Sequence, residues 1–142
     1  MAIHHIIYHY LLGIRKFIVY NEARNLRYLF QPFIDLKIVI YIPSHFKTQI
    51  ECQLKTVKLA RENSINFLGL LDVDEFVVLK NHETIPFMLS KVGKNQSVVC
   101  IPWIFMNGSD SLSRELLTPL FEICPSLNCG SMSTTVKSFV RP

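Results

Sequence analysis

Several features that mark other protein classes are scarce or missing in this sequence. Charged residues make up 18% of the 142 residues and hydrophobic residues 49%, a balance too apolar for a disordered chain. No run reaches the ~18 uninterrupted apolar residues that a transmembrane helix needs. The first residues, Met1–Tyr8, lack the basic segment and small-residue cleavage site of a signal peptide. The composition therefore predicts a globular domain with a substantial core.

The cysteines form no recognisable metal-binding pattern. The sequence has four of them, with neither a CxxC pair nor a cysteine–histidine zinc spacing. Cys52 and Cys100 lie in apolar segments and are expected in the core. Cys124 and Cys129 flank a short loop, where two interpretations stay open: a small disulfide in an oxidising compartment, or two free thiols.

Positive charge is present but not concentrated. The net charge is +4 and the isoelectric point is near 8.9, which suits an anionic ligand such as a nucleotide diphosphate. The basic residues are scattered. Their one local group, Lys55, Lys58 and Arg61, is predicted to be the solvated face of a helix. We therefore expect no nucleic-acid interface.

Apolar periodicity alternates between helical and extended segments. This alternation indicates an α/β protein with a mostly parallel sheet covered on both faces. No internal repeat or linker interrupts it, so residues 1–142 are expected to form a single domain. Helices are predicted at residues 2–12 (ending at Gly13), 22–33 (ending early at Pro32), 45–62 and 84–91, strands at residues 17–20, 37–42, within 66–78, 96–103 and 134–140, and a long loop with one helical turn at residues 107–131.

Two helical patterns carry further predictions. In the longest helix, Ile50, Leu54, Val57 and Ala60 mark the expected buried stripe. In the first helix, His5 and His9 have the i,i+4 spacing of a metal-binding pair. They lack the intervening glutamate and a third ligand, so core or surface histidines are the expected outcome.

An acidic segment at residues 67–76, FLGLLDVDEF, is the most informative part of the sequence. An apolar strand runs directly into three carboxylates, although strand interiors disfavour aspartate and buried charges need partners. On a strand, Asp72 and Asp74 project to the same face, where two carboxylates can share Mg²⁺ or Mn²⁺. Glu75 points to the opposite face and is expected to pair with a basic residue or brace the loop. The alternative is a solvated turn after a core strand.

The order of four segments resembles glycosyltransferase family 92 and its family-2-like relatives. These segments are LGIRKFIVYNE (residues 12–22), FLGLLDVDEFVV (67–78), IPWIFMNGSD (101–110) and VKSFVRP (136–142). The resemblance extends from about Tyr8 to Pro142, and the Asp-Val-Asp-Glu-Phe and Lys-Ser-Phe-Val-Arg-Pro matches are its specific parts. It implies a GT-A fold, meaning a Rossmann-like, nucleotide-diphospho-sugar-binding domain. It also implies a UDP-sugar donor, a metal ion, and transfer of a hexose such as galactose to a glycan acceptor with inversion.

The resemblance also implies roles for individual residues. Asp72 and Asp74 match the metal-binding aspartates, and Asn21 matches a Tyr-Asp-Asn region near the nucleotide. Trp103 matches a tryptophan before the acceptor-side loop. Lys137 and Arg141 match two basic residues of the family that are suited to binding phosphate.

The sequence departs from the family pattern at several places. Tyr20-Asn21-Glu22 stands where the family has Tyr-Asp-Asn, and the family's Phe-Gly-Ser is altered around Gly108. The family begins with a strand upstream of the first helix seen here and continues past Arg-Pro. The chain is therefore expected to be a partial GT-A domain, truncated at both ends. Eukaryotic relatives are usually anchored in the Golgi membrane, whereas a bacterial member would be cytoplasmic.

A mechanism follows from the resemblance and from general chemistry. A metal held by Asp72 and Asp74 would neutralise the leaving UDP, and a carboxylate would deprotonate the acceptor hydroxyl. Asp110 is the candidate base, with Glu115 and Glu122 as weaker candidates, and Trp103 is a candidate for stacking on a sugar. Each candidate residue also has a simpler interpretation. Asp110 would be an ordinary loop acid, and Trp103 would pack in the core. Asn21 would cap the helix that follows, and Lys137 and Arg141 would be surface cations.

Two other functional classes stay open. A haloacid-dehalogenase-like phosphatase also carries Asp-x-Asp after an apolar strand. In that family the motif lies on the first strand, and the residue two positions after the second aspartate is usually Thr or Val. Here two predicted strands precede the motif, and that residue is Phe76. The other class is a catalytically inactive, truncated glycosyltransferase-like remnant.

Overall fold

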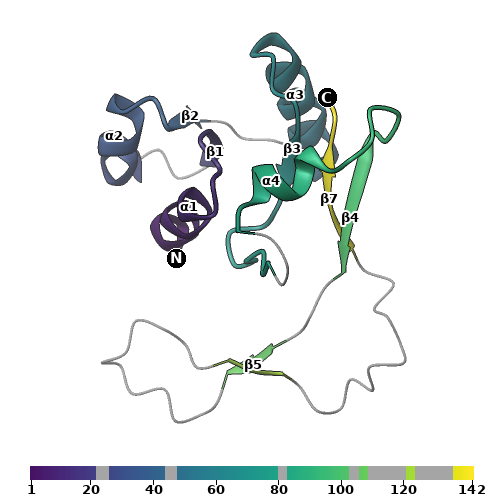
Figure 1. Cartoon of the computed structure of the whole chain (residues 1–142). Helices are drawn as coiled ribbons and strands as arrows, with labels where there is room; N and C mark the ends of the chain where they lie inside the picture. Colours follow the sequence, from purple (N-terminus) through teal and green to yellow (C-terminus); the bar gives the residue numbers. More distant parts are fainter. Residues whose placement is uncertain (22–25, 44–47, 80–82, 103–105, 109–120, 124–135) are drawn as a thin grey trace.

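The computed structural model describes residues 1–21, 26–43, 48–79, 83–102, 106–108, 121–123 and 136–142. Helices and strands alternate from the first helix to the fourth strand, which confirms the mixed α/β class (Figure 1). The helices are α1 (Ala2–Leu11), α2 (Arg27–Asp35), α3 (Gln49–Glu62) and α4 (Ile85–Ser90), and the strands are β1 (Phe17–Asn21), β2 (Val39–Pro43), β3 (Leu68–Leu70), β4 (Val98–Pro102), β5 (Met106–Gly108), β6 (Phe121–Ile123) and β7 (Val136–Val140).

The first half of the fold is a parallel strand pair. Phe17 of β1 lies opposite Val39 of β2. The helices α1 and α2 lie beside this pair (Figure 1) and bury Ile6 and Phe30 against Val39. Gly13 follows α1 with φ +99°, a backbone conformation that ends a helix at little cost for glycine alone. The predicted helix end at Gly13 is confirmed.

The second half is an antiparallel sheet with β7 between β3 and β4. Its core contains Val77, Ile85, Leu89 and Phe139. Thr84 caps α4 by accepting a hydrogen bond from the Phe87 amide at 3.2 Å, and proline follows in the first turn as predicted. The segment nearest the C-terminus therefore becomes the central strand of this sheet.

The expected mostly parallel sheet is not what the described residues form. They contain one parallel pair, β1–β2, and three antiparallel pairs: β3–β7, β4–β7 and β5–β6. The pair β5–β6 lies within the predicted loop at residues 107–131, so that prediction was wrong where the structure describes the segment. Hydrophobic runs do not reveal strand direction, because direction is set by which distant segments pair.

Two helix predictions need correction. The second helix does not stop at Pro32 but continues to Asp35, and Pro32 itself accepts a hydrogen bond from the Leu36 amide at 3.2 Å. Proline at this position removes one helical bond to the first turn and leaves the later ones intact. In α3, Ile50 and Leu54 are both 68% exposed, whereas Thr56 and Ala60 are buried. The inward face is therefore rotated from the predicted stripe.

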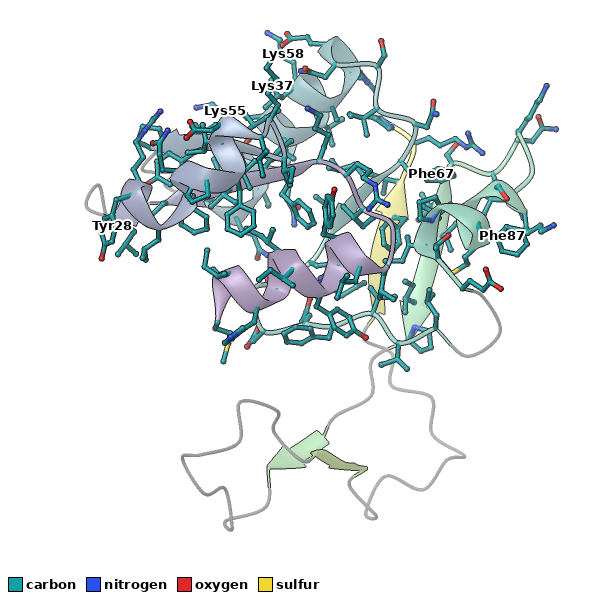
Figure 2. The ribbon with its side chains drawn as sticks, turned by 60° about the vertical axis from the view of Figure 1, so that its left-hand side comes forward. Tyr28, Lys37, Lys55, Lys58, Phe67 and Phe87 are labelled. Carbon is teal, nitrogen blue, oxygen red and sulfur yellow. The ribbon has the colours of Figure 1, made fainter. Side chains whose placement is uncertain are left out.

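The surface of α3 matches the charge pattern of the sequence. Lys55, Lys58 and Arg61 are exposed, and Figure 2 shows Lys55 and Lys58 at the outer side of the molecule. Cys100, expected in the core, is exposed because it lies on the solvent-facing side of β4, as Val98 and Pro102 do. Within the described ranges, no helix is long and apolar enough to cross a membrane.

Candidate functional site

The acidic motif forms a turn, not a strand. Strand β3 ends at Leu70, and the Glu75 amide donates to the Asp72 carbonyl at 3.0 Å. The Glu75 carboxylate accepts a hydrogen bond from the Asp72 amide at 2.8 Å, which is a second hydrogen bond across the turn. The prediction that Asp72 and Asp74 share one strand face was therefore wrong, and the local conformation matches the alternative of a turn after a core strand. Both aspartates are exposed at this turn.

Lys137 of β7 joins the turn from a distant part of the chain. Its ammonium lies 2.7 Å from the Asp72 carboxylate and 3.2 Å from the Glu75 carboxylate. Burial by itself lowers the pKa of Lys137, but the hydrogen bonds and negative charges of Asp72 and Glu75 outweigh it, and the pKa is raised overall. The predicted pairing of Glu75 with a basic residue is confirmed. In this structure Lys137 serves the turn as a structural cation.

Exposure separates the members of this acidic cluster, defined as Asp72, Asp74, Glu75 and Lys137. The side chains of Glu75 and Lys137 are 17% and 19% exposed, whereas that of Asp72 is 55% exposed. Glu75 and Lys137 therefore form an inner pair that braces the turn, and the aspartates form its outer edge. Three carboxylates and one ammonium leave excess negative charge, which favours binding of a cation.

Asn21 lies at the end of β1 and lines the same cavity as Asp72 and Lys137. Its side-chain amide donates to the Tyr41 hydroxyl at 2.9 Å, which fixes the orientation of the amide. The following helix begins at Arg27 with Leu26 as its N-cap residue, so the alternative of Asn21 as a helix cap is wrong. The structure thus places three of the predicted site residues around one cavity.

Arg141 does not join this group. Lys137 and Arg141 are four residues apart on an extended segment, a separation of about 13 Å. The Arg141 guanidinium donates to the Gln96 carbonyl at 2.9 Å and lies 4.2 Å from the centre of the Phe67 ring. These contacts tie the end of β7 to the α4–β4 connection. They assign Arg141 a structural role at the far end of the sheet from the acidic turn.

Helix α1 holds the segment after the acidic turn, a contact that the sequence patterns did not reveal. The Tyr8 hydroxyl donates to the Val77 carbonyl at 2.9 Å. Nε2 of His9 accepts from the Val77 amide at 3.3 Å, while Nδ1 of His9 donates to the His5 carbonyl at 2.9 Å. Both ring nitrogens of His9 are thus engaged, which requires the neutral imidazole. His9 is a core histidine, one of the two outcomes expected from the sequence.

His5 and His9 of α1 are held in their uncharged forms. Burial, reinforced by the nearby His9, lowers the pKa of His5 to about 4, and the carbonyl of Glu75 and the charge of Asp74 oppose this shift only in part. Burial also lowers the pKa of His9. His5 and His9 pack against Phe76, with His9 stacked on its ring at 5.9 Å between centroids. The acidic turn therefore rests on a neutral aromatic surface at ordinary pH.

Several predicted residues lie outside the described part of the structure. These are the acceptor-side candidate Trp103, the candidate base Asp110, the weaker candidate Glu115, and the cysteine pair Cys124 and Cys129. Glu122 lies on β6, of which only the backbone pairing is described. Their predicted roles stay predictions.

Asp72 and Asp74 are the exposed carboxylates of the turn and the residues that could hold a metal ion there. Within the described residues, no group of three or more potential ligands is close enough to enclose a metal. Mg²⁺ and Mn²⁺ sites that also use substrate phosphates need only one or two carboxylates. Two exposed aspartates beside an ammonium-braced glutamate match that limited donor set.

Comparisons of the chain with protein-family models, curated proteins and solved structures found no match. The family resemblance therefore rests on the four quoted sequence segments alone.

Proposed function

We propose that this chain belongs to a metal-dependent GT-A glycosyltransferase domain that uses a UDP-sugar donor. The observation that carries the proposal is the convergence of Asn21, Asp72 and Lys137 on one cavity, with Asp72 at the outer edge of a braced acidic turn. Asn21 lies at the carboxyl end of β1 and Asp72 follows the carboxyl end of β3, and α/β proteins bind nucleotides beyond such strand ends. Lys137 lies near the amino end of the antiparallel strand β7. Mixed α/β architecture is consistent with this proposal.

In this proposal, Asp72 and Asp74 hold Mn²⁺ or Mg²⁺ at the solvent side of the turn. The bound ion would supply neutralisation of the donor's diphosphate. Glu75 keeps the turn closed through the Asp72 amide, and Lys137 limits repulsion among the carboxylates. Asn21, whose side-chain amide is held by Tyr41, lines the cavity and would contact the nucleotide. Asp110 keeps its proposed role as the base that takes the acceptor hydroxyl proton.

In this proposal the Asp72 carboxylate contacts both Lys137 and the metal ion. Lys137 contacts Oδ2, and the side chain is more than half exposed. A cation on the solvent side would share the carboxylate with Lys137, since an ionised carboxylate has two oxygens that accept contacts. We therefore expect metal binding to weaken the Lys137–Asp72 contact and leave Lys137 with Glu75.

The proposal is tested by titrating UDP into the folded chain with and without Mn²⁺ in a calorimeter. We expect binding that depends on manganese and is lost in Asp74→Asn. Asp35→Asn is the matched control, because Asp35 lies at the end of α2 with its carboxylate on Gln31. Equal UDP binding without manganese, or unchanged binding in Asp74→Asn, would contradict the metal–diphosphate site.

A second candidate is a glycosyltransferase-like domain that has lost turnover. The observation in its favour is the lining of the cavity of about 890 Å³, which is mostly apolar and offers few polar groups to hold a charged donor. This candidate predicts a folded chain that hydrolyses or transfers no UDP-sugar. Detection of UDP release from UDP-galactose, dependent on Asp74, would exclude it. The haloacid-dehalogenase-like alternative is less favoured, because β1 and β2 precede the acidic motif.

A further inference from the structure

Helix α3 carries an apolar stripe on its outer side. Ile50 and Leu54 are both 68% exposed and lie one helical turn apart on the same face. The half-buried Val57 and the exposed Arg61 continue this line toward the end of the helix. The intervals between these residues alternate between four and three, which is the spacing of the seam along which two helices pack in a coiled coil. The outer stripe, defined as Ile50, Leu54, Val57 and Arg61, therefore has the pattern of a helix-binding surface.

The opposite face of α3 belongs to the interior of the domain. Thr56 and Ala60 are buried, and both line the cavity together with Cys52. Among the described residues, the lining of that cavity includes no member of the outer stripe. A helix bound along the outer stripe would therefore leave the cavity unfilled.

Charged residues beside the outer stripe make it complementary to a second copy of itself. Glu51 and Lys58 lie on the same flank of the stripe, about two helical turns apart. When two α3 helices pack antiparallel, Ile50 of each lies beside Arg61 of the other, and Glu51 of each faces Lys58 of the other. Two identical ion pairs then form across the interface. Parallel packing in register would instead bring the two Arg61 side chains together, a like-charge contact that is unfavourable.

The mixture of charges favours a protein partner over an anionic membrane. On α3, the acids Glu51 and Glu62 accompany three basic residues, Lys55, Lys58 and Arg61. Anionic lipid surfaces attract helices with a strongly basic polar face, whereas charges of alternating sign along a helix are typical of helix pairs. Glu51 already contacts Lys55 of its own helix at 3.4 Å. Because an ionised carboxylate accepts more than one hydrogen bond, Glu51 can contact a second cation and keep the first.

We propose that the outer stripe of α3 binds a second copy of this chain, with the two α3 helices antiparallel and related by a two-fold axis. Helix α3 has 14 residues and is therefore about 21 Å long. A contact of that length buries less than the roughly 1,200 Å² that stable interfaces need. The dimer is accordingly weak, with an expected Kd above about 1 µM. This inference does not depend on the proposed transferase activity.

The first test is the molecular mass of the chain at rising concentration. Sedimentation equilibrium from about 1 to about 500 µM covers the range expected for a weak dimer. We expect the average mass to rise from 16.4 kDa toward twice that value. Leu54→Gln should raise the Kd by about tenfold or more, because it places a polar group at the centre of the stripe in both copies. Leu36→Gln is the matched control, since Leu36 is 69% exposed and follows α2.

Thermal unfolding checks that each variant folds, as expected for substitutions at exposed positions. A wild-type chain that stayed monomeric over the whole concentration range would overturn the proposal. So would a Leu54→Gln variant that dimerised as well as the Leu36→Gln control.

The second test exchanges charges between the copies. Glu51→Lys and Lys58→Glu should each raise the Kd by about tenfold or more, because each puts like charges into both contacts of the dimer. In an equimolar mixture of the two variants, both contacts join opposite charges again. A mixed dimer with nearly wild-type affinity is therefore expected from the mass of the mixture. A mixture that associated no better than either variant alone would overturn the antiparallel arrangement.

A third measurement tests a membrane as the alternative occupant. Vesicles of phosphatidylcholine and phosphatidylserine are sedimented with the wild-type chain and with Leu54→Gln. We expect neither chain to sediment with the vesicles. Binding of the wild-type chain that is lost in Leu54→Gln would assign the outer stripe to an anionic membrane surface and overturn the proposal. Failure of UDP binding in a chain that dimerises as described would contradict only the proposed function.

Discussion

Lys137 and Asp72 are 65 residues apart in sequence and form an ion pair of 2.7 Å. This contact connects the central strand β7 to the acidic turn that follows β3. Because Lys137 also reaches the less exposed Glu75 at 3.2 Å, it compensates an acid that has little access to water. The position of the candidate metal ligands therefore depends on a residue from the other end of the chain.

Replacing Lys137 with methionine should destabilise the fold. The change keeps most of the side-chain volume but leaves Glu75 without its cation, and an uncompensated, largely buried charge costs about 1–3 kcal/mol of unfolding free energy. Urea unfolding measures the loss. Lys55→Met is the matched control, since Lys55 forms an exposed i,i+4 pair with Glu51 and should cost under about 0.5 kcal/mol. Equal effects of the two substitutions would show that Lys137 has no special structural role.

Replacing His9 with phenylalanine should cost more than removing the Tyr8 hydroxyl. His9→Phe leaves the buried Val77 amide without its acceptor, a loss of about 1–3 kcal/mol. Tyr8→Phe removes one hydrogen bond, worth about 0.5–1.5 kcal/mol. Both are measured by urea unfolding against Tyr28→Phe, whose side chain is 70% exposed. If Tyr28→Phe had the same effect as His9→Phe, α1 would not anchor the segment after the turn.

Stability should fall on mild acidification. The pKa of His5 is about 4 in the folded chain and about 6.5 when unfolded, and the pKa of His9 is also lowered. Between these values the unfolded chain binds more protons, so the free energy of unfolding rises with pH in this window and is lost as pH falls from about 6.5 toward 4. The backbone carbonyls of Glu75 and Val73 and the charge of Asp74 oppose this lowering of the His5 pKa but do not outweigh it.

Unfolding midpoints measured from pH 7.5 to 4.5 test this pH dependence. The His5→Phe variant should show a weaker dependence on pH, because it removes the titrating group while keeping an aromatic ring beside Phe76. His4→Phe is the control, since His4 is exposed on the same helix. A wild-type midpoint that stayed constant or rose between pH 6.5 and 4.5 would contradict the assignment of neutral, buried histidines.

Gly69 should tolerate no side chain. A Cβ atom at this position would lie 2.6 Å from the Phe139 ring, a contact that forces the core ring to move. Gly69→Ala should therefore cost about 1–3 kcal/mol. Gly93→Ala provides the comparison, since a Cβ atom at Gly93 would lie 3.5 Å from the Gln96 side-chain oxygen, an ordinary contact distance. Thermal unfolding that ranked the two substitutions in the opposite order would count against the β3–β7 packing described here.

Local features of the fold were accessible from sequence because their causes are local. The helical period marked α1, α3 and α4, Gly13 marked the end of α1, and Pro86 marked the start of α4. The polar and charged face of α3 followed from residue spacing. The residues that α3 buries did not follow from spacing, because the apolar residues Ile50 and Leu54 are exposed in this fold.

The candidate site shows the same division between local and tertiary causes. The sequence by itself determined that an apolar segment runs into Asp72, Asp74 and Glu75, and that such a cluster needs a cation. The turn itself is local, since its hydrogen bonds join Asp72 to Glu75. Tertiary structure decided that Lys137 pairs with these acids and that Arg141 lies elsewhere. It also decided strand direction and the cavity lined by β1 and β3. The physical reason is range: turns, caps and periods depend on neighbouring residues, whereas ion pairs and strand neighbours depend on which distant segments meet when the core forms.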